Sequence, residues 1–297
     1  MSAQYKGTLM VLASAAGFAT LTIFIKLAYM AGANTVTILT MRFMLSSFIL
    51  WPILKLRGIP VNLGAKTITR LCLMGALGYG ITSTCLTIAI NHLPASLAAM
   101  LFYIYPALVT LISFAAGDEQ IAWHKSLALA ICFAGLLLIL GVSFSSVNLT
   151  GVIFGLCAAA VYSGYIIVGN RVLKNINPLV ATTYVCSSAG VAFTAIGLIQ
   201  DSLILSLPLA GWLAVAGIAL PGTIIGILFF FAGLCRIGAA NASIISTTEP
   251  LITVLLSVAL LDDKISLLQA LGGLLVIAGI MILQLWNRPA ASLVSQQ

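Results

Sequence analysis

Apolar residues run along this chain in ten stretches of about 20 residues each, separated by short polar or glycine-containing turns. Within each stretch the apolar character is continuous, whereas a strand of a membrane barrel would be about 10 residues of alternating polarity. The pattern therefore predicts an all-α integral membrane protein with ten transmembrane helices. The expected spans are 8–30, 35–54, 70–90, 95–116, 123–142, 150–172, 178–199, 209–232, 239–260 and 266–286.

The composition agrees with a bilayer environment. Hydrophobic residues make up 62% of the chain and charged residues 6%, while soluble domains are about 45–50% apolar and about 25% charged. We therefore expect a multi-pass protein of the cell inner membrane or plasma membrane, surrounded by membrane lipid. The six cysteines form no CxxC pair, and we expect no metal site, no disulfide framework and no cofactor.

The distribution of Lys and Arg predicts the orientation in the membrane. When the N-terminus is placed in the cytoplasm, Lys264 alone among the 13 basic residues falls on the outer side, and Lys26 and Arg42 lie within spans. The other basic residues face the cytoplasm or flank that side. Both termini are therefore expected to be cytoplasmic. The net charge of +7 is explained by this topology, so nucleic acid is not expected as a partner.

The chain also matches itself at a constant offset of 144 residues, without gaps. This offset pairs Gly78 with Gly222, Pro106 with Pro250 and Asp118 with Asp262, among others. The sequence therefore predicts two repeats, residues 1–142 with spans 1–5 and residues 143–297 with spans 6–10 and a short cytoplasmic tail. Because each repeat has an odd number of spans, the two have opposite orientation, as in many alternating-access transporters.

Several short motifs occur in the same order along the chain. They are the small-residue run Ala239–Ser243, the dipeptide Glu249-Pro250, the sequence Leu261-Asp262-Asp263, and Gln269 followed by Gly272 and Gly273, with Lys26 and Arg42 in the first two spans. In this order, and with the duplication, the chain resembles the EamA-type transporters of the drug/metabolite transporter superfamily. It departs from their pattern where the usual Gly-Glu is replaced by Asp262-Asp263, and where Tyr105-Pro106 stands in the first half.

The resemblance implies an exporter or exchanger of small metabolites. It also implies a central cavity walled largely by spans 3, 4, 8 and 9, with contributions from spans 1 and 6. The substrate is not implied, because members of the family differ widely in what they move.

Glu249 is an acid in the middle of a long apolar span, where an ionised carboxylate costs several kcal/mol unless it faces a cavity, finds a partner or takes up a proton. Helical spacing places it on one face of span 9, together with small and hydroxyl residues: Ala242, Ser246, Thr253 and Ser257. Close helix packing would explain the small residues, but the acid adds nothing to packing, so the pattern favours a cavity wall. Pro250 lacks an amide hydrogen and leaves the Ser246 carbonyl without its usual helical partner. Pro221-Gly222 and Pro106 interrupt spans 8 and 4 similarly.

The offset maps this stripe onto span 4, where Phe102 and Tyr105 stand opposite the acid. One carboxylate facing aromatic rings suits a solute with a cationic group and an apolar body, such as an amino acid, an amine or a cationic drug. Tyr79, Ser83 and Tyr162 are further candidates for the wall, although each also fits an interhelical hydrogen bond.

Arg42 has two main interpretations. It could form a structural ion pair with Glu249, or it could bind a carboxylate of the solute; snorkelling or another partner is a third. Lys26, one turn from the outer end of its span, is expected to snorkel. Coupling of transport to a proton on Glu249 stays open.

The function expected from these residues is secondary transport of small metabolites such as amino acids, by alternating access around a central cavity. Efflux of cationic drugs or quaternary amines is the alternative. A membrane-embedded enzyme is less well supported, because the sequence has no HExxH motif and no paired aspartates within the spans, and it lacks the GxxxxGK[ST] loop of an ATPase. A small-molecule solute is the expected partner. A homodimer is a further one, since Gly222 and Gly226 could pack helices within one chain or between two.

Overall fold

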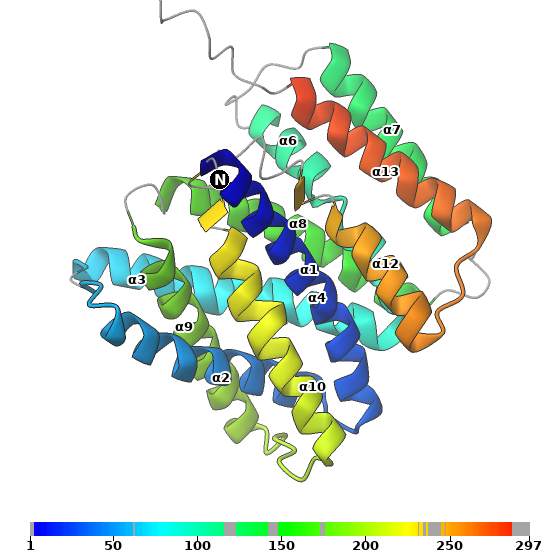
Figure 1. Cartoon of the computed structure of the whole chain (residues 1–297). Helices are drawn as coiled ribbons and strands as arrows, with labels where there is room; N and C mark the ends of the chain where they lie inside the picture. Colours follow the sequence, from blue (N-terminus) through cyan, green and yellow to red (C-terminus); the bar gives the residue numbers. More distant parts are fainter. Residues whose placement is uncertain are drawn as a thin grey trace, which may run out of the picture.

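The computed structural model describes residues 3–61, 63–115, 123–141, 148–172, 176–230, 232–233, 236, 245–246 and 248–286. Within these ranges every regular element is helical (Figure 1). The elements are α1 (Ala3–Met30), α2 (Thr35–Leu56), α3 (Ala65–Leu73), η1 (Met74–Tyr79), α4 (Gly80–His92), α5 (Ala95–Phe102), α6 (Tyr105–Ala115), α7 (Trp123–Gly141), α8 (Leu149–Val172), α9 (Pro178–Ile199), α10 (Leu209–Ala219), η2 (Leu220–Ile225), α12 (Thr248–Leu261) and α13 (Leu267–Trp286).

Six helices of the described chain are long and apolar enough to cross a membrane. They cover Tyr5–Met30, Thr35–Leu56, Ala65–His92, Leu149–Gly169, Pro178–Ile199 and Leu209–Phe230. These correspond to expected spans 1, 2, 3, 6, 7 and 8. The other four expected spans fall on α5 with α6, α7, α12 and α13, and parts of spans 4, 5 and 9 lie outside the described residues. The all-helical membrane class is thus confirmed, and the number of ten spans stays a prediction.

Two of the long helices contain a stretch of π-helix. In the helix from Ala65 to His92 the stretch is η1, and in the helix from Leu209 to Phe230 it is η2. η2 contains Pro221-Gly222, where the sequence predicts an interruption. Pro221 cannot donate to a carbonyl of the preceding turn, and a wider i→i+5 turn accommodates it. η1 lies at nearly the same place in the first half and was not predicted.

The predicted interruption of span 4 also occurs. α5 ends at Phe102, and α6 begins at Tyr105. Tyr103 has φ −70° and ψ 5°, which is outside the usual range of an α-helix. The amide nitrogen of Pro106 carries no hydrogen, so the carbonyl of Phe102 loses its helical donor and the helix stops there.

The two halves of the chain pack against each other through several helix pairs. α2 packs against α9, α4 against α8, and α7 against α13. The pair α7 and α13 forms one edge of the bundle (Figure 1). Glycines permit the close approach in the last pair. A Cβ on Gly135 would lie 2.6 Å from the carbonyl oxygen of Gly272, and one on Gly279 would lie 2.5 Å from the Cys132 sulfur.

The glycine pair in span 8 packs within the chain. A Cβ on Gly222 would lie 3.1 Å from the Leu21 side chain, and one on Gly226 would lie 2.7 Å from the Phe18 ring, both on α1. These glycines thus bring η2 and the residues after it close to α1.

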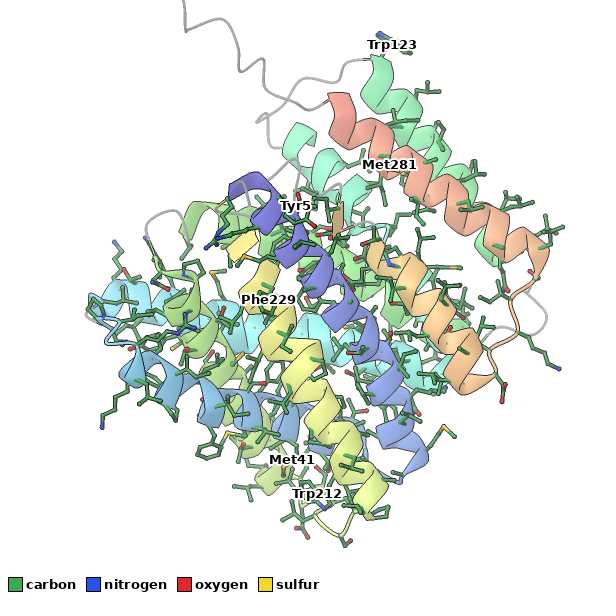
Figure 2. All side chains as sticks on the ribbon, viewed as in Figure 1. Tyr5, Met41, Trp123, Trp212, Phe229 and Met281 are labelled. Atoms are coloured by element: carbon green, nitrogen blue, oxygen red, sulfur yellow. The ribbon has the colours of Figure 1, made fainter. Side chains whose placement is uncertain are left out.

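Large apolar side chains remain exposed on the outside of the bundle, where Figure 2 labels Trp123 and Met281 among others. Leu255 of α12 is 70% exposed and Trp123 of α7 is 71% exposed. On the opposite face of α12, Thr253 and Ser257 are buried. A helix with an apolar outer face and a hydroxyl-bearing inner face is the reverse of a soluble amphipathic helix, and it fits lipid outside the bundle.

Candidate functional site

An aromatic cluster joins the two halves in the interior of the bundle. Its rings come from η1, the α5–α6 break and α8, and consecutive members have ring centroids 4.9–6.2 Å apart. The cluster contains Tyr79, Phe102, Tyr103, Tyr105, Tyr162 and Tyr165. Four of these were predicted from the sequence as cavity residues, and the structure brings those four together. Rings in tilted and edge-to-face pairs present both electron-rich faces and hydroxyls, which suits contact with organic cations.

Glu249 lies at one end of this cluster. Its Oε2 accepts a hydrogen bond of 2.5 Å from the Tyr103 hydroxyl. Its Oε1 has no hydrogen-bond donor within the described part of the chain. The side chain is partly exposed, while Tyr103 is only 4% exposed. Glu249 therefore has one oxygen fixed from behind and the other available to a ligand.

The carbonyl of Ser246 also accepts a hydrogen bond from the Tyr103 hydroxyl. Pro250 cannot donate to it, and the Tyr103 hydroxyl lies 3.2 Å away. The carbonyl that the sequence predicts to lose its helical donor is therefore bonded by a side chain from the other half of the protein.

Arg42 lies at the other end of the cluster and is 2% exposed. Its Nη2 donates to the Tyr79 hydroxyl at 3.0 Å, and its Nε donates to Thr223 Oγ1 at 2.9 Å. The guanidinium also lies over the rings of Phe43 and Tyr79, with its carbon 4.9 and 5.5 Å from their centroids. The ion pair with Glu249, one of the interpretations that the sequence left open, is not formed in this structure: neither Glu249 nor any other described carboxylate is paired with Arg42. Hydroxyls and ring faces hold the cation instead.

The hydroxyls that hold Arg42 come from the two π-helical segments. Tyr79 is the last residue of η1, and Thr223 lies within η2. Thr223 in turn donates to the carbonyl of Ile218 at 2.8 Å, which fixes its lone pairs toward the arginine. Gly78 allows the Tyr165 ring to lie against η1, because a Cβ there would be 2.8 Å from the ring. π-helical turns of this kind are frequent at functional sites.

Two other predicted residues are buried but take no visible part in the cluster. Ser83 on α4 is 3% exposed and Thr253 on α12 is 1% exposed. Neither hydroxyl forms a hydrogen bond to the cluster within the described residues. Their burial agrees equally with helix packing, the alternative that the sequence left open.

Lys26, which the sequence predicts to snorkel, is half-exposed and is held by backbone carbonyls. Its Nζ donates to the carbonyls of Ile90 at 3.0 Å and Leu93 at 3.2 Å. These carbonyls lie at the C-terminal end of α4, where backbone acceptors lack helical donors and a cation is favoured. Lys26 therefore joins α1 to the end of α4.

Tyr103, the residue that donates to Glu249, was not predicted from the sequence. Helical spacing from Glu249 and the repeat offset points to Tyr105, because it assumes an unbroken helix through span 4. The break before Tyr105 changes the helical phase, so Tyr103 faces Glu249. Pro106 was the available signal.

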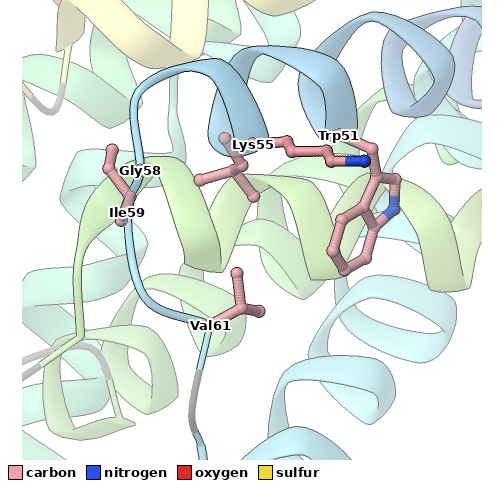
Figure 3. A pocket seen from close by; sticks show the side chains of 6 residues that line it. Trp51, Lys55, Gly58, Ile59 and Val61 are labelled. Atoms are coloured by element: carbon pink, nitrogen blue, oxygen red, sulfur yellow. The ribbon is translucent and has the colours of Figure 1, made fainter.

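The structure also shows a pocket of about 340 Å³ at the end of α2, lined by Trp51, Leu54, Lys55, Gly58, Ile59 and Val61. Figure 3 shows the Lys55 side chain extended toward Trp51 along the helix. None of these residues belongs to the aromatic cluster, so the pocket is separate from the candidate site. Among the described residues, no group of three or more His, Cys, Asp or Glu side chains is arranged to hold a metal.

Comparison with known proteins agrees with a transport role. A family model described as "EamA-like transporter family" matches residues 5–141 and again residues 149–285. "Uncharacterized transporter YcbK" of Bacillus subtilis is 28% identical over 278 residues, which cover 90% of this chain and 88% of that protein. "Protein PecM" of Dickeya dadantii is 21% identical over 220 residues, covering 72% and 73%. A solved crystal structure has a TM-score of 0.68 at 18% identity, with 96% of this chain and 99% of that one covered; this likeness concerns the fold alone.

Proposed function

The chain belongs to the EamA-like transporter family, and from this membership we propose that it is a secondary transporter that exports or exchanges small metabolites such as amino acids. The observation that carries the proposal is the separation of Arg42 from Glu249. One cation and one anion lie at opposite ends of a single aromatic cluster, and neither is neutralised by the other.

The Glu249 end suits the cationic group of a solute. Glu249 is partly exposed, and its Oε1 has no donor within the described chain. An ammonium group could bind this oxygen and lie against the faces of the neighbouring rings, Tyr105 and Tyr162. Ionisable residues within membrane spans generally mark a substrate or ion pathway, which supports this role for Glu249.

The Arg42 end suits a carboxylate. A guanidinium has five N–H donors in a fixed fork, and those of Arg42 make two hydrogen bonds to described residues, to Tyr79 and Thr223. An anionic group of the solute would supply a counter-charge for Arg42, which the described residues do not provide. The cluster therefore offers a counter-charge for each of the two ionised groups of an amino acid.

Efflux of cationic drugs or quaternary amines is the second candidate. It is favoured by the same carboxylate and rings, because these suffice for a cation without a carboxylate. The two candidates differ in whether Arg42 contributes to binding, and this difference can be measured.

Alternating access between the two halves would move the solute across the membrane. Under this proposal the halves are inverted repeats, and the interrupted segments at η1, η2 and the α5–α6 break are the places where the helices bend. Discontinuous helices near the middle of the membrane commonly form the binding site in such transporters. Cross-half contacts such as Tyr103 with Glu249 would then change with each transport step.

Counterflow in proteoliposomes tests the proposal. Vesicles loaded with unlabelled L-leucine, isopentylamine, N-acetyl-L-leucine or a quaternary amine would be assayed for uptake of the same labelled compound. We expect accumulation of L-leucine. The exchange rate of Glu249→Gln should be at least about tenfold lower, because a neutral amide cannot form an ion pair with an ammonium.

Asp201→Asn is the matched control, since it makes the same chemical change at an exposed loop acid. It should exchange at the wild-type rate. Transport of isopentylamine and the quaternary amine without L-leucine would select the second candidate. Wild-type exchange by Glu249→Gln, or no counterflow of any of these compounds, would contradict the proposed site.

A further inference from the structure

The Tyr103 hydroxyl lies between two acceptors of the second half. One is Glu249 Oε2 at 2.5 Å, and the other is the carbonyl oxygen of Ser246 at 3.2 Å. A phenol has a single proton, so it donates strongly to one acceptor at a time. The shorter contact has the length of a charge-assisted O–H···O⁻ bond. The present arrangement therefore has the proton directed at the carboxylate.

The second acceptor exists because of Pro250. In an unbroken helix, the amide of residue 250 would donate to the Ser246 carbonyl, four positions earlier. Proline has no such hydrogen, and Tyr103 is in place to supply one. The donor comes from the break between α5 and α6, so the hydroxyl connects the interrupted helix of the first half to the residues around Pro250 in the second.

Rotation about the C–O bond of Tyr103 alone is enough for its hydroxyl to change acceptor. Both oxygens lie within hydrogen-bond distance of the same hydroxyl, and the ring can stay where it is. Tyr103 is 4% exposed, which places it behind Glu249 and out of the path of a ligand that reaches Oε1. A ligand could therefore alter what Tyr103 bonds to without touching it.

We propose that Tyr103 is a positioning residue that changes its hydrogen-bond acceptor when a solute binds. The inference rests on the proposed function, in which an ammonium group pairs with Glu249. In the empty transporter the hydroxyl donates to Glu249. Once an ammonium neutralises the carboxylate, that oxygen becomes a weaker acceptor, and the hydroxyl turns to the Ser246 carbonyl. The phenol keeps its proton throughout, and only the acceptor changes.

This change has a consequence for transport. A loaded site weakens the connection between the α5–α6 break and the start of α12, because Tyr103 exchanges its short bond to the Glu249 carboxylate for a longer bond to the Ser246 carbonyl. An empty site keeps that connection stronger. Solute binding is thereby transmitted to the α5–α6 break and to the residues around Pro250, as a transporter requires if only particular states are to change conformation.

The kinetics of Tyr103→Phe test the proposal. The variant loses a strong bond in the empty state and a weaker one in the loaded state, so it favours the loaded state. We expect the KM for L-leucine or isopentylamine exchange to fall by about fivefold to tenfold. The maximal exchange rate should also fall, by at least about fivefold, because binding is no longer transmitted. A purely structural role would lower the amount of folded protein without lowering KM. An increased or unchanged KM would overturn the proposal.

Two further variants sharpen this result. Pro250→Ala restores the backbone donor to Ser246, so it should slow exchange while leaving KM within about twofold of wild type, because the Tyr103–Glu249 bond remains. Tyr184→Phe makes the same chemical change as Tyr103→Phe on α9, outside the site, and should alter neither constant. Tighter binding in Pro250→Ala would contradict the assignment of Ser246 as the second acceptor.

A measurement without solute separates this inference from the proposed function. Melting temperatures of wild type, Tyr103→Phe, Glu249→Met and the double variant form a double-mutant cycle. We expect the two single effects to be non-additive, since each removes the same bond. Additive effects would overturn the role of Tyr103 alone. Non-additive effects together with no counterflow of either solute would overturn the proposed function, and the solute-driven change with it.

Discussion

Asp263 accepts two hydrogen bonds from Ser96, one from its backbone amide at 3.2 Å and one from its hydroxyl at 3.0 Å, both through Oδ2. Ser96 lies in the first turn of α5, where amides lack helical acceptors and a carboxylate is favoured. Asp263 belongs to the connection between α12 and α13, so the contact ties the second half to the first. Lys26, which holds the end of α4, also attracts Asp263. This end of the bundle is the one that the charge distribution predicts to lie outside the cytoplasm.

A disulfide between these positions should block transport. In a cysteine-free background, Ser96→Cys with Asp263→Cys places two thiols where hydrogen bonds now join the start of α5 to the α12–α13 connection. If this end must open for alternating access, oxidation should reduce L-leucine exchange by at least about tenfold, and reduction should restore it. Exchange is measured before and after oxidant, and each single cysteine variant serves as control. Full exchange by the cross-linked protein would show that this end does not open at Ser96.

Replacement of Arg42 should discriminate between solutes. If Arg42 binds the solute carboxylate, Arg42→Gln should lower L-leucine exchange by at least about tenfold and leave isopentylamine exchange much less affected. The ratio of the two rates in one preparation removes differences in the amount of folded protein. Arg42→Lys keeps the charge without the planar fork and should give an intermediate ratio. An unchanged ratio in Arg42→Gln would assign Arg42 to structure alone.

Gly17 should be indispensable for the packing of α1 against η2. A Cβ at Gly17 would lie 2.6 Å from the carbonyl oxygen of Pro221, which is backbone and cannot move aside. Gly17→Ala should therefore destabilise the fold by about 1–3 kcal/mol, although alanine in a helix is otherwise favoured by about 1 kcal/mol. Gly164→Ala is the matched control, because nothing lies within 4 Å of its Cβ position. Unfolding in detergent measures both, and equal stability of the two variants would contradict the packing described for Gly17.

The helical class and much of the site could be predicted because they depend on simple periodicity. Long apolar runs specify helices in lipid, and spacing along span 9 is sufficient to place Thr253 and Ser257 on the buried face of α12. The proline positions also indicated where helices are interrupted, as at Pro106 and Pro221. These features are local in the sequence, so no knowledge of neighbouring helices was needed.

The remaining features depend on contacts between distant segments. The π-helical turn of η1 has no proline to announce it, and its only signal was Gly78, which the repeat offset pairs with Gly222. The partner of Arg42 could not be deduced, because a buried guanidinium can be satisfied by hydroxyls and rings as well as by a carboxylate. Tyr103 escaped notice because periodicity cannot be carried across a helix break.

The topology can be tested at two loop positions that the charge distribution assigns to opposite sides. Arg57 follows α2 and Lys264 lies between α12 and α13, and both side chains are exposed. In a cysteine-free background, Lys264→Cys should react with a membrane-impermeant maleimide in intact cells, because its loop is predicted to lie outside. Arg57→Cys should react only after permeabilisation, since Lys and Arg concentrate in cytoplasmic loops. Labelling of Arg57→Cys in intact cells would reverse the predicted orientation, and it would also place the Asp263–Ser96 contact at the cytoplasmic end of the bundle. Equal labelling of both variants in intact cells would mean that the chain inserts in both orientations, which the strong bias of its basic residues argues against.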